Sequence, residues 1–211
     1  MKTSDLIVLL AQDAPVRISF NQALVHAAIA ATLIAGAGFF GFIGFRVDID
    51  TAVESVRFLF KFAVTLALAV TAGLVLLQIG KPGACVRRWA WGLLIPAALV
   101  AGAAALELFV TPSLTWETRM IGHNARLCLT IIPSLSAIPL ACFLFAMQHG
   151  APERPGLAGA VAGLVSAGIA ATFYAANCTD DSPLFVMFWY PIAIAAVSAL
   201  GALLGQRVLQ W

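Results

Sequence analysis

The chain has 211 residues, of which 62% are hydrophobic and only 10% charged, and its formal net charge is +2. Soluble domains carry roughly 45–50% apolar and about 25% charged residues, so these few charges could not cover a soluble surface of this size. The composition excludes a cytosolic enzyme, a disordered tail and a nucleic-acid-binding domain that depends on a basic patch. Four cysteines are too few for a disulfide-stapled secreted module. An integral membrane protein, small enough to form one bundle, remains.

Six windows of the chain are apolar over the roughly 20 residues that a helix needs to cross a bilayer. They cover residues 23–45, 58–79, 89–111, 127–147, 156–176 and 184–204. None alternates with a period of two, and backbone polar groups in lipid must be satisfied internally, so we expect α-helices. The sequence therefore predicts an all-α fold with a six-helix transmembrane domain over residues 23–211.

The positions of Lys and Arg predict that both ends of the chain face the cytoplasm, an N-in/C-in arrangement. With that orientation the inner basic residues are Lys2, Arg17, Lys81, Arg87, Arg88, Arg154 and Arg207, and the outer ones are Arg46, Arg57, Lys61, Arg119 and Arg126. Most of the acidic residues then lie outside. The inner loop from Lys81 to Arg88 contributes most to this prediction.

Residues 1–22 are predicted to form a cytosolic amphipathic segment rather than a secretory signal, because their apolar run is too short for a signal peptide. Asp5 stands in the expected first turn, and Leu6, Leu9 and Leu10 share one face. Two interpretations stay open: a helix that lies on the inner membrane surface, or a docking segment for a cytosolic partner.

Lys61 and Glu107 are the ionisable side chains that fall clearly within apolar windows. Both lie near the outer surface in the predicted topology, so we expect a structural Lys61–Glu107 ion pair. No acid, base or histidine is expected near a midplane, which argues against a proton-coupled carrier. Two G-x-x-x-G pairs, Gly159 with Gly163 and Gly201 with Gly205, predict close packing between helices.

Two of the four cysteines, Cys128 and Cys178, share the outer side in this topology, whereas Cys85 and Cys142 lie towards the inner side. Their spacing alone predicts neither a disulfide nor a metal site. Nearby residues that could act as auxiliary metal ligands are His123, Asp180 and Asp181. Three interpretations stay open for the outer pair: a regulatory site for a soft or borderline metal ion, a pair that oxidises to a disulfide, and a purely structural role.

No catalytic motif is visible, since the chain contains no G-x-S-x-G, no H-E-x-x-H and no Walker glycine loop. We therefore do not expect an enzyme, and no cofactor is expected to be obligatory. Two alternatives remain from other classes. One is a quinone-coupled membrane thiol oxidoreductase, which ordinarily needs a second outer cysteine pair. The other is a small transporter, which the absence of midplane charges and of an inverted repeat disfavours.

Several stretches resemble the NrsF family of six-helix membrane anti-sigma factors. They are Met1–Ile7, Asn124–Leu129 running into Ile132-Pro133, and above all Cys178–Val186 followed by Trp189-Tyr190. Where the family often has a histidine before the second cysteine, this chain has Asn177. The resemblance implies a multi-pass protein of the bacterial inner membrane that keeps an extracytoplasmic-function (ECF) sigma factor of the sigma-F kind from RNA polymerase. It also implies release under heavy-metal or oxidative stress, for which Cys128 and Cys178 are needed.

The resulting hypothesis has an outer sensor and an inner docking surface. The residues expected to hold the sigma factor are Asp5, Leu6, Ile7, Leu9, Leu10, Arg87 and Arg88. The expected partners are the sigma factor and the lipid bilayer, without direct nucleic-acid contact, and a homo-oligomer stays an open alternative.

Overall fold

The computed structural model describes residue 7 and residues 18–210, and within this part every regular element is helical. The long helices are α2 (Phe20–Phe42), α4 (Val56–Ile79), α6 (Leu94–Val110), α8 (Ala125–Met147), α9 (Pro155–Ala175) and α10 (Pro183–Val208). The short ones are α3 (Ile49–Ala52), α5 (Val86–Ala90) and α7 (Trp116–Ile121), with 3-10 turns η1 (Trp91–Leu93) and η2 (Ser113–Thr115). The all-α prediction is confirmed, and six of these helical segments are long and apolar enough to cross a membrane.

The first long helix begins earlier than the sequence suggested. Ser19 is the N-cap of α2: its hydroxyl accepts from the backbone N–H of Gln22, and the Gln22 side chain accepts from the backbone N–H of Ser19. This reciprocal pair satisfies backbone donors that a helix start otherwise leaves free, so the helix starts at Phe20. The predicted boundary between residues 22 and 23 therefore falls inside α2.

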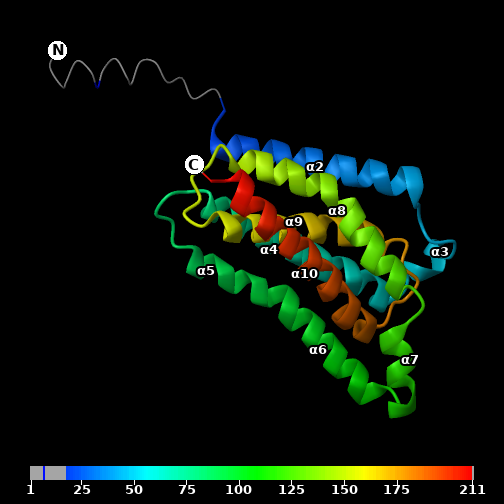
Figure 1. The fold of residues 1–211 in the computed structure, drawn as a ribbon. Coiled ribbons are helices and arrows are strands. Elements are labelled where there is room, and N and C mark those ends of the chain that lie inside the picture. Colours follow the sequence, from blue (N-terminus) through cyan, green and yellow to red (C-terminus); the bar gives the residue numbers. More distant parts are fainter. Residues whose placement is uncertain (1–6, 8–17, 211) are drawn as a thin grey trace.

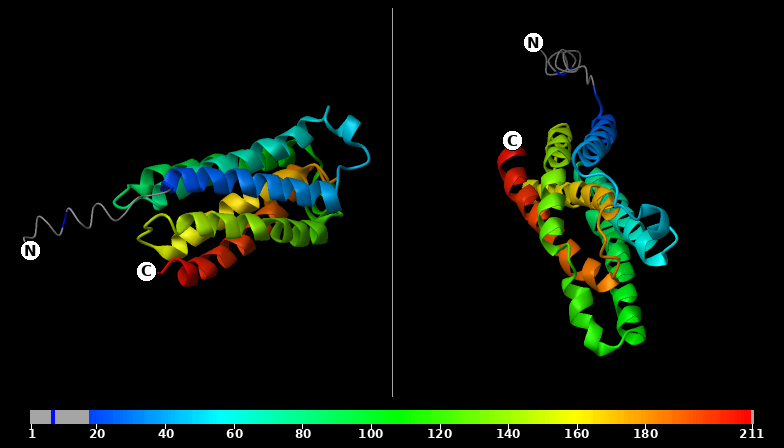
Figure 2. Two further views of the ribbon diagram at one scale, coloured as in Figure 1. Left: turned by 90° about the horizontal axis from the view of Figure 1, so that it is seen from above. Right: turned by 90° about the vertical axis from the view of Figure 1, so that its right-hand side faces the viewer.

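The long helices run alongside one another, and the bundle has two distinct ends (Figure 1). One end, called here the terminal end, contains the start of α2, the loop between α4 and α5, the loop between α8 and α9 and the end of α10. The opposite end, called the cysteine end, carries α3, α7 and the loop 176–182 between α9 and α10 (Figure 2). Helix α6 diverges from the other long helices towards α7.

Helices α9 and α10 touch through glycine near the terminal end, as the two G-x-x-x-G pairs predicted. A Cβ added at Gly159 would overlap the carbonyl of Gly201, and one added at Gly163 would lie 2.7 Å from Cα of Ser198. At Gly205 an added Cβ would lie 2.6 Å from the Pro155 carbonyl oxygen. Because only glycine allows this backbone approach, these residues set the distance between the two helices.

A second close contact at the terminal end holds the start of α2. The ring of Phe20 occupies a notch between Gly80 and Gly150, where a Cβ on either glycine would overlap it. The backbone N–H of Ala151 donates to the carbonyl of Gly80 (3.1 Å) and so joins the two loops that form the notch. The start of α2 is therefore fixed against the loops that follow α4 and α8.

Candidate functional site

The two outer cysteines lie in one buried cluster at the cysteine end. Cys128 stands one turn into α8 and is fully buried, and Cys178 in the loop 176–182 is 1% exposed. Both are free thiols. The rings of Tyr174 and Tyr190 belong to the same cluster, and the Tyr190 hydroxyl is the one buried side-chain oxygen or nitrogen without a hydrogen-bond partner in the described part of the chain. The fold thus brings together residues from α8, α9, α10 and the loop.

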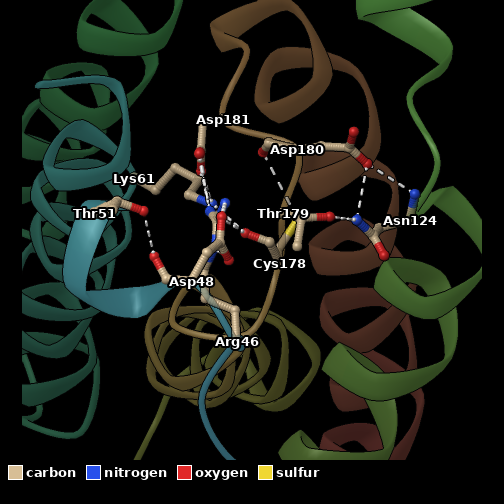
Figure 3. A network of polar contacts seen from close by, with 9 residues as sticks. All are labelled: Arg46, Asp48, Thr51, Lys61, Asn124, Cys178, Thr179, Asp180 and Asp181. Carbon is tan, nitrogen blue, oxygen red and sulfur yellow. Dashed lines mark hydrogen bonds and ion pairs between the residues drawn. The ribbon is translucent and has the colours of Figure 1, made fainter. Parts of the chain in front are cut away.

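Asp180 connects the loop of Cys178 to the start of α8 (Figure 3). Its Oδ2 accepts from the backbone N–H groups of His123 (2.9 Å) and Asn124 (2.7 Å) and from Nδ2 of Asn124 (3.1 Å). The carboxylate therefore caps the helix that carries Cys128, where the helix dipole favours a negative charge. Gly122 makes the approach feasible, because it has φ +59° and a Cβ there would lie 2.8 Å from Cγ of Asp180.

Asp181 points away from Asp180, towards two cations on the other side of the loop (Figure 3). Its carboxylate binds Nζ of Lys61 (2.6 Å) and Nη1 of Arg46 (2.9 Å). Arg46, which follows α2, also makes a two-pronged contact with Asp48 (2.7 and 2.6 Å). The adjacent carboxylates therefore tie one loop to α8 on one side and to α2 and α4 on the other.

The same two cations converge on the backbone of Cys178. Its carbonyl oxygen accepts from Nζ of Lys61 (2.7 Å) and from Nη1 of Arg46 (3.3 Å). Lys61 is completely buried, and both cations lie over the ring of Phe58, at 5.3 Å for Lys61 and 5.7 Å for Arg46. Burial of a charge is costly unless it is paired and hydrogen-bonded, so this arrangement fixes the loop.

The predicted Lys61–Glu107 pair is wrong, because each residue has other partners. Lys61 binds Asp181, whereas Glu107 binds Arg119 (2.9 Å) and, at 3.7 Å, Arg57. Glu107 also accepts from the Ser182 hydroxyl and the backbone N–H of Leu184 at the start of α10. The sequence placed both residues at a similar depth but gave no information on which helices are neighbours.

The candidate auxiliary ligands do not converge with the thiols. The side chain of His123 is 96% exposed, and its Nδ1 lies 3.8 Å from Oδ1 of Asp180. Asp180 caps α8, and Asp181 is engaged by Lys61 and Arg46. No group of three or more His, Cys, Asp or Glu side chains suited to a metal ion occurs among the described residues. The two thiols therefore share a buried cluster without the predicted auxiliary ligands.

The electrostatics of the loop follow from burial and from the two cations. Burial raises the pKa of the Cys178 thiol, and the nearby charge of Lys61 offsets part of that increase. The contact with Arg46 lowers the pKa of Asp48. The hydrogen bond to Asp48 is the main cause that raises the pKa of Arg46 further above its usual range. At neutral pH Cys178 is consequently a protonated thiol that is shielded from solvent.

Sequence comparisons relate the chain to a known protein family over nearly its whole length. Residues 9–211 match the family described as "Negative regulator of sigma F", NrsF. The chain belongs to the NrsF family. It is 31% identical to the anti-sigma-F factor NrsF of Caulobacter vibrioides and 30% identical to a probable anti-sigma-F factor NrsF of Azospira oryzae, with 100% of each chain covered in both cases. No solved structure matches it significantly.

NrsF family membership identifies a regulatory protein, a negative regulator of a sigma factor. The residues predicted to dock that sigma factor belong to the terminal end as far as they are described. Arg87 and Arg88 are exposed on the short helix α5, and Ile7 is exposed. Asp5, Leu6, Leu9 and Leu10 lie outside the described residues.

Two residues that hold the loop in this NrsF-family chain were not among the site residues predicted from the sequence. Arg46 contacts both the Cys178 carbonyl and Asp181, and Asn124 connects α8 to the loop. Asn177, at the position where the family often has histidine, donates to the carbonyl of Gly44 (3.1 Å) and adds a further tie to the end of α2. In the sequence, Arg46 is one of several basic residues next to a predicted span. Its role depends on contact with Cys178, which lies 132 residues further along the chain.

Proposed function

We propose that this chain is a membrane-embedded anti-sigma factor with its terminal end in the cytoplasm, where it holds an ECF sigma factor of the sigma-F type. Release follows when Cys128 and Cys178 are joined at the opposite, periplasmic end. The observation that carries the proposal is the placement of two buried thiols on separate elements, α8 and the loop 176–182, within one cluster. A change at that pair acts directly on the helices that run to the terminal end.

The two ends differ in net charge rather than in basic residues, because each carries five described Lys or Arg residues but the cysteine end carries seven of the eight described acids. The terminal end carries Lys81, Arg87, Arg88, Arg154 and Arg207 with Glu153 as its acid among the described residues. The cysteine end has seven acids, namely Asp48, Asp50, Glu54, Glu107, Glu117, Asp180 and Asp181. Basic segments of inner-membrane proteins favour the cytoplasm, and the oxidising periplasm is where thiol pairs form disulfides.

The docking surface in this proposal combines the sequence before α2 with the basic residues of α5. Phe20 packs against Gly80 and Gly150, so the start of α2 and the α4–α5 loop, which leads to Arg87 and Arg88, belong to the same end of the bundle. The apolar face predicted for the N-terminal sequence, together with these basic residues, suits a protein partner with an apolar groove and an acidic rim.

Two chemical events can join the thiols. In oxidation, the two S–H bonds break, one S–S bond forms, and two protons leave while an external two-electron oxidant is reduced. In metal binding, the thiols lose two protons and a soft metal ion bridges the two thiolates. Either event ties the start of α8 to the α9–α10 loop.

Helices α2 and α8 are the route from the sensor to the docking surface. Each has one end in the contacts around Cys178 and the other at the Phe20 notch. Helices are stiff, so a shift at one end reaches the other end. A differential affinity of roughly 2–3 kcal/mol between the two states releases most of the partner and lies within the usual range of allosteric coupling.

The sensor half is tested with a sigma-factor-dependent reporter in cells. Cys128→Ser and Cys178→Ser variants should repress the reporter without stress and lose induction by an oxidant or by a thiophilic metal. Cys85→Ser and Cys142→Ser, at other positions, are matched controls and should respond normally. Normal induction in the Cys128→Ser and Cys178→Ser variants would sink the sensor assignment.

The docking half is tested by co-purification of the chain with its sigma factor. Deletion of residues 1–18 should abolish retention, and replacement of Arg87 and Arg88 by alanine should weaken it. Replacement of Arg119 and Arg126, which belong to the cysteine end, should leave retention unchanged. Equal retention by the truncated chain would contradict the proposed docking surface.

A further inference from the structure

Both thiols are shut off from solvent in the structure, so their chemistry depends on what holds the loop of Cys178 in place. Cys128 is 0% and Cys178 1% exposed. No bond joins the two sulfur atoms, and Cys178 Sγ makes a long contact to the Asp180 carbonyl oxygen (3.7 Å). The strong interactions of Cys178 are those of its backbone. Its N–H donates to the Tyr174 carbonyl (3.0 Å), and its carbonyl accepts from Lys61 and Arg46.

We infer that Lys61 is a positioning residue for Cys178, whose ammonium holds the carbonyl oxygen of Cys178 and thereby keeps the thiol shielded until the loop is released. The inference rests on the thiol response proposed above and names the side chain that sets its threshold. Lys61 reaches the carbonyl from one turn into α4, at 2.7 Å, and Asp181 of the same loop supplies its counter-charge at 2.6 Å.

Burial makes this contact hard to replace. Lys61 has no solvent exposure, and beside the carbonyl and the carboxylate its ammonium faces the Phe58 ring in a cation–π contact at 5.3 Å, which provides no hydrogen-bond acceptor of comparable strength. If the loop moves away, the ammonium loses the carbonyl and the carboxylate together. The contact therefore has two states, closed with both partners or open with neither, which is the behaviour expected of a threshold rather than a gradual change.

Arg46 is the weaker of the two cations on the carbonyl. Its Nη1 lies 3.3 Å from the oxygen, and Asp48 takes its other nitrogens. Loss of Lys61 would leave the Cys178 carbonyl with this longer bond alone, and Asp181 with Arg46 as its remaining cation partner. The prediction is thus specific to Lys61 among the basic residues of the cysteine end.

The test is the alkylation rate of single cysteines in the purified full-length chain. In a chain that retains Cys178 alone, Lys61→Met should raise the alkylation rate by N-ethylmaleimide at least tenfold. Lys61→Arg should restore a slow rate, since a guanidinium can donate to both the carbonyl and the carboxylate. Arg57→Met is the matched control. Arg57 is a half-exposed cation on the same helix, and its side chain contacts Glu107 rather than the loop.

A chain that retains Cys142 alone measures general loosening, because Cys142 packs in the other apolar cluster of the bundle. Its rate should change less than twofold in Lys61→Met. A Cys178 rate that stays within twofold of the Arg57→Met control, or an equal acceleration of Cys142, overturns the inference. If Lys61→Met does not accumulate, Asp181→Asn is measured in the same way, with at least threefold acceleration of Cys178 expected and no acceleration overturning the inference.

The alkylation assay needs no sigma factor, so its outcome is independent of the proposed function. In cells, Lys61→Met should lower the oxidant concentration for half-maximal reporter induction at least threefold. Accelerated alkylation together with normal induction of Cys128→Ser and Cys178→Ser would retain Lys61 as the positioning residue and reject the sensor role of the cysteines. Slow alkylation in Lys61→Met together with uninducible cysteine variants would reject Lys61 as the positioning residue and retain the sensor role of the cysteines.

Discussion

The two ends of the bundle are held together by different forces. At the terminal end, Gly159 and Gly201 bring two backbones into contact, and Phe20 fills a notch between Gly80 and Gly150. At the cysteine end, two adjacent acids hold the loop 176–182 in place. Asp181 binds Lys61 and Arg46 on one side, and Asp180 binds the start of α8 on the other. Close packing is insensitive to the state of a thiol, whereas ion pairs on a loop that carries the thiol are not. We therefore expect the terminal end to be rigid and, under the proposed function, the cysteine end to respond.

The largest expected effect comes from a substitution in the glycine contact at the terminal end. Gly201→Leu should lower the free energy of unfolding by about 3 kcal/mol or more, because α9 and α10 must move apart to admit the side chain. The measurement is denaturant unfolding of the purified protein in a mild detergent. Gly73→Leu is the control, since nothing lies within 4 Å of a Cβ at Gly73. Equal losses in both variants would contradict glycine-mediated contact.

Removal of the counter-charge probes the other end. Asp181→Ala should cost about 3 kcal/mol of unfolding free energy, since breaking a buried ion pair leaves an uncompensated charge, here that of Lys61. The acid is partly exposed, which reduces the loss below that of a fully buried pair. The same unfolding measurement on Asp50→Ala, an exposed acid of the same end, should show almost no change. A loss as small as that of the control would show that the loop does not depend on Asp181.

A substitution in the Phe20 notch changes the terminal end alone, so it tests docking separately from the thiols of the cysteine end. Phe20→Ala should cost about 1 kcal/mol, as expected for a half-buried aromatic ring, and should weaken sigma-factor retention. Alkylation of Cys178 should stay unchanged. Phe40→Ala, which removes an exposed ring from the same helix, is the control in a co-purification assay. Faster alkylation of Cys178 in Phe20→Ala would mean that the two ends are not separable in this way.

The smallest effect concerns pH at the cysteine end. Arg46 lowers the pKa of Asp48 below the usual value, so the contact stabilises the fold above the unfolded pKa of about 4 and is lost as the pH falls through the lower folded pKa. Thermal unfolding between pH 6 and pH 3 should show this loss as a slightly steeper decline than in Asp48→Asn. Identical pH profiles for the two proteins would remove Asp48 from the set of contacts that hold Arg46.

The length of the apolar windows was sufficient to predict the six long helices, because spanning length and hydropathy are local properties. The predicted window 127–147 differs from α8, Ala125–Met147, only at its start. The start of α2 was placed three residues too late, since the reciprocal contact between Ser19 and Gln22 outweighed the hydrophobic pattern. The glycine pairs were also correctly assigned to packing, because small residues at that spacing have few other uses in apolar helices.

The contacts of the site required the tertiary structure. The pairing of Lys61 with Asp181 joins residues from α4 and the α9–α10 loop, and no local pattern encodes which helices are neighbours. The sequence was sufficient to predict that Cys128 and Cys178 share one end of the bundle. Their burial, and the cations on the Cys178 carbonyl, could not be predicted, because both depend on how the loop 176–182 folds over α4.

The most direct test of the account measures sigma-factor affinity of the purified chain in lipid nanodiscs before and after diamide treatment. Mass spectrometry of the same samples should verify the Cys128–Cys178 disulfide. The account predicts that the dissociation constant rises at least about 30-fold on oxidation, corresponding to roughly 2 kcal/mol of coupling, and that the doubly substituted Cys128→Ser, Cys178→Ser protein shows no change. An unchanged dissociation constant in protein that carries the disulfide would contradict it.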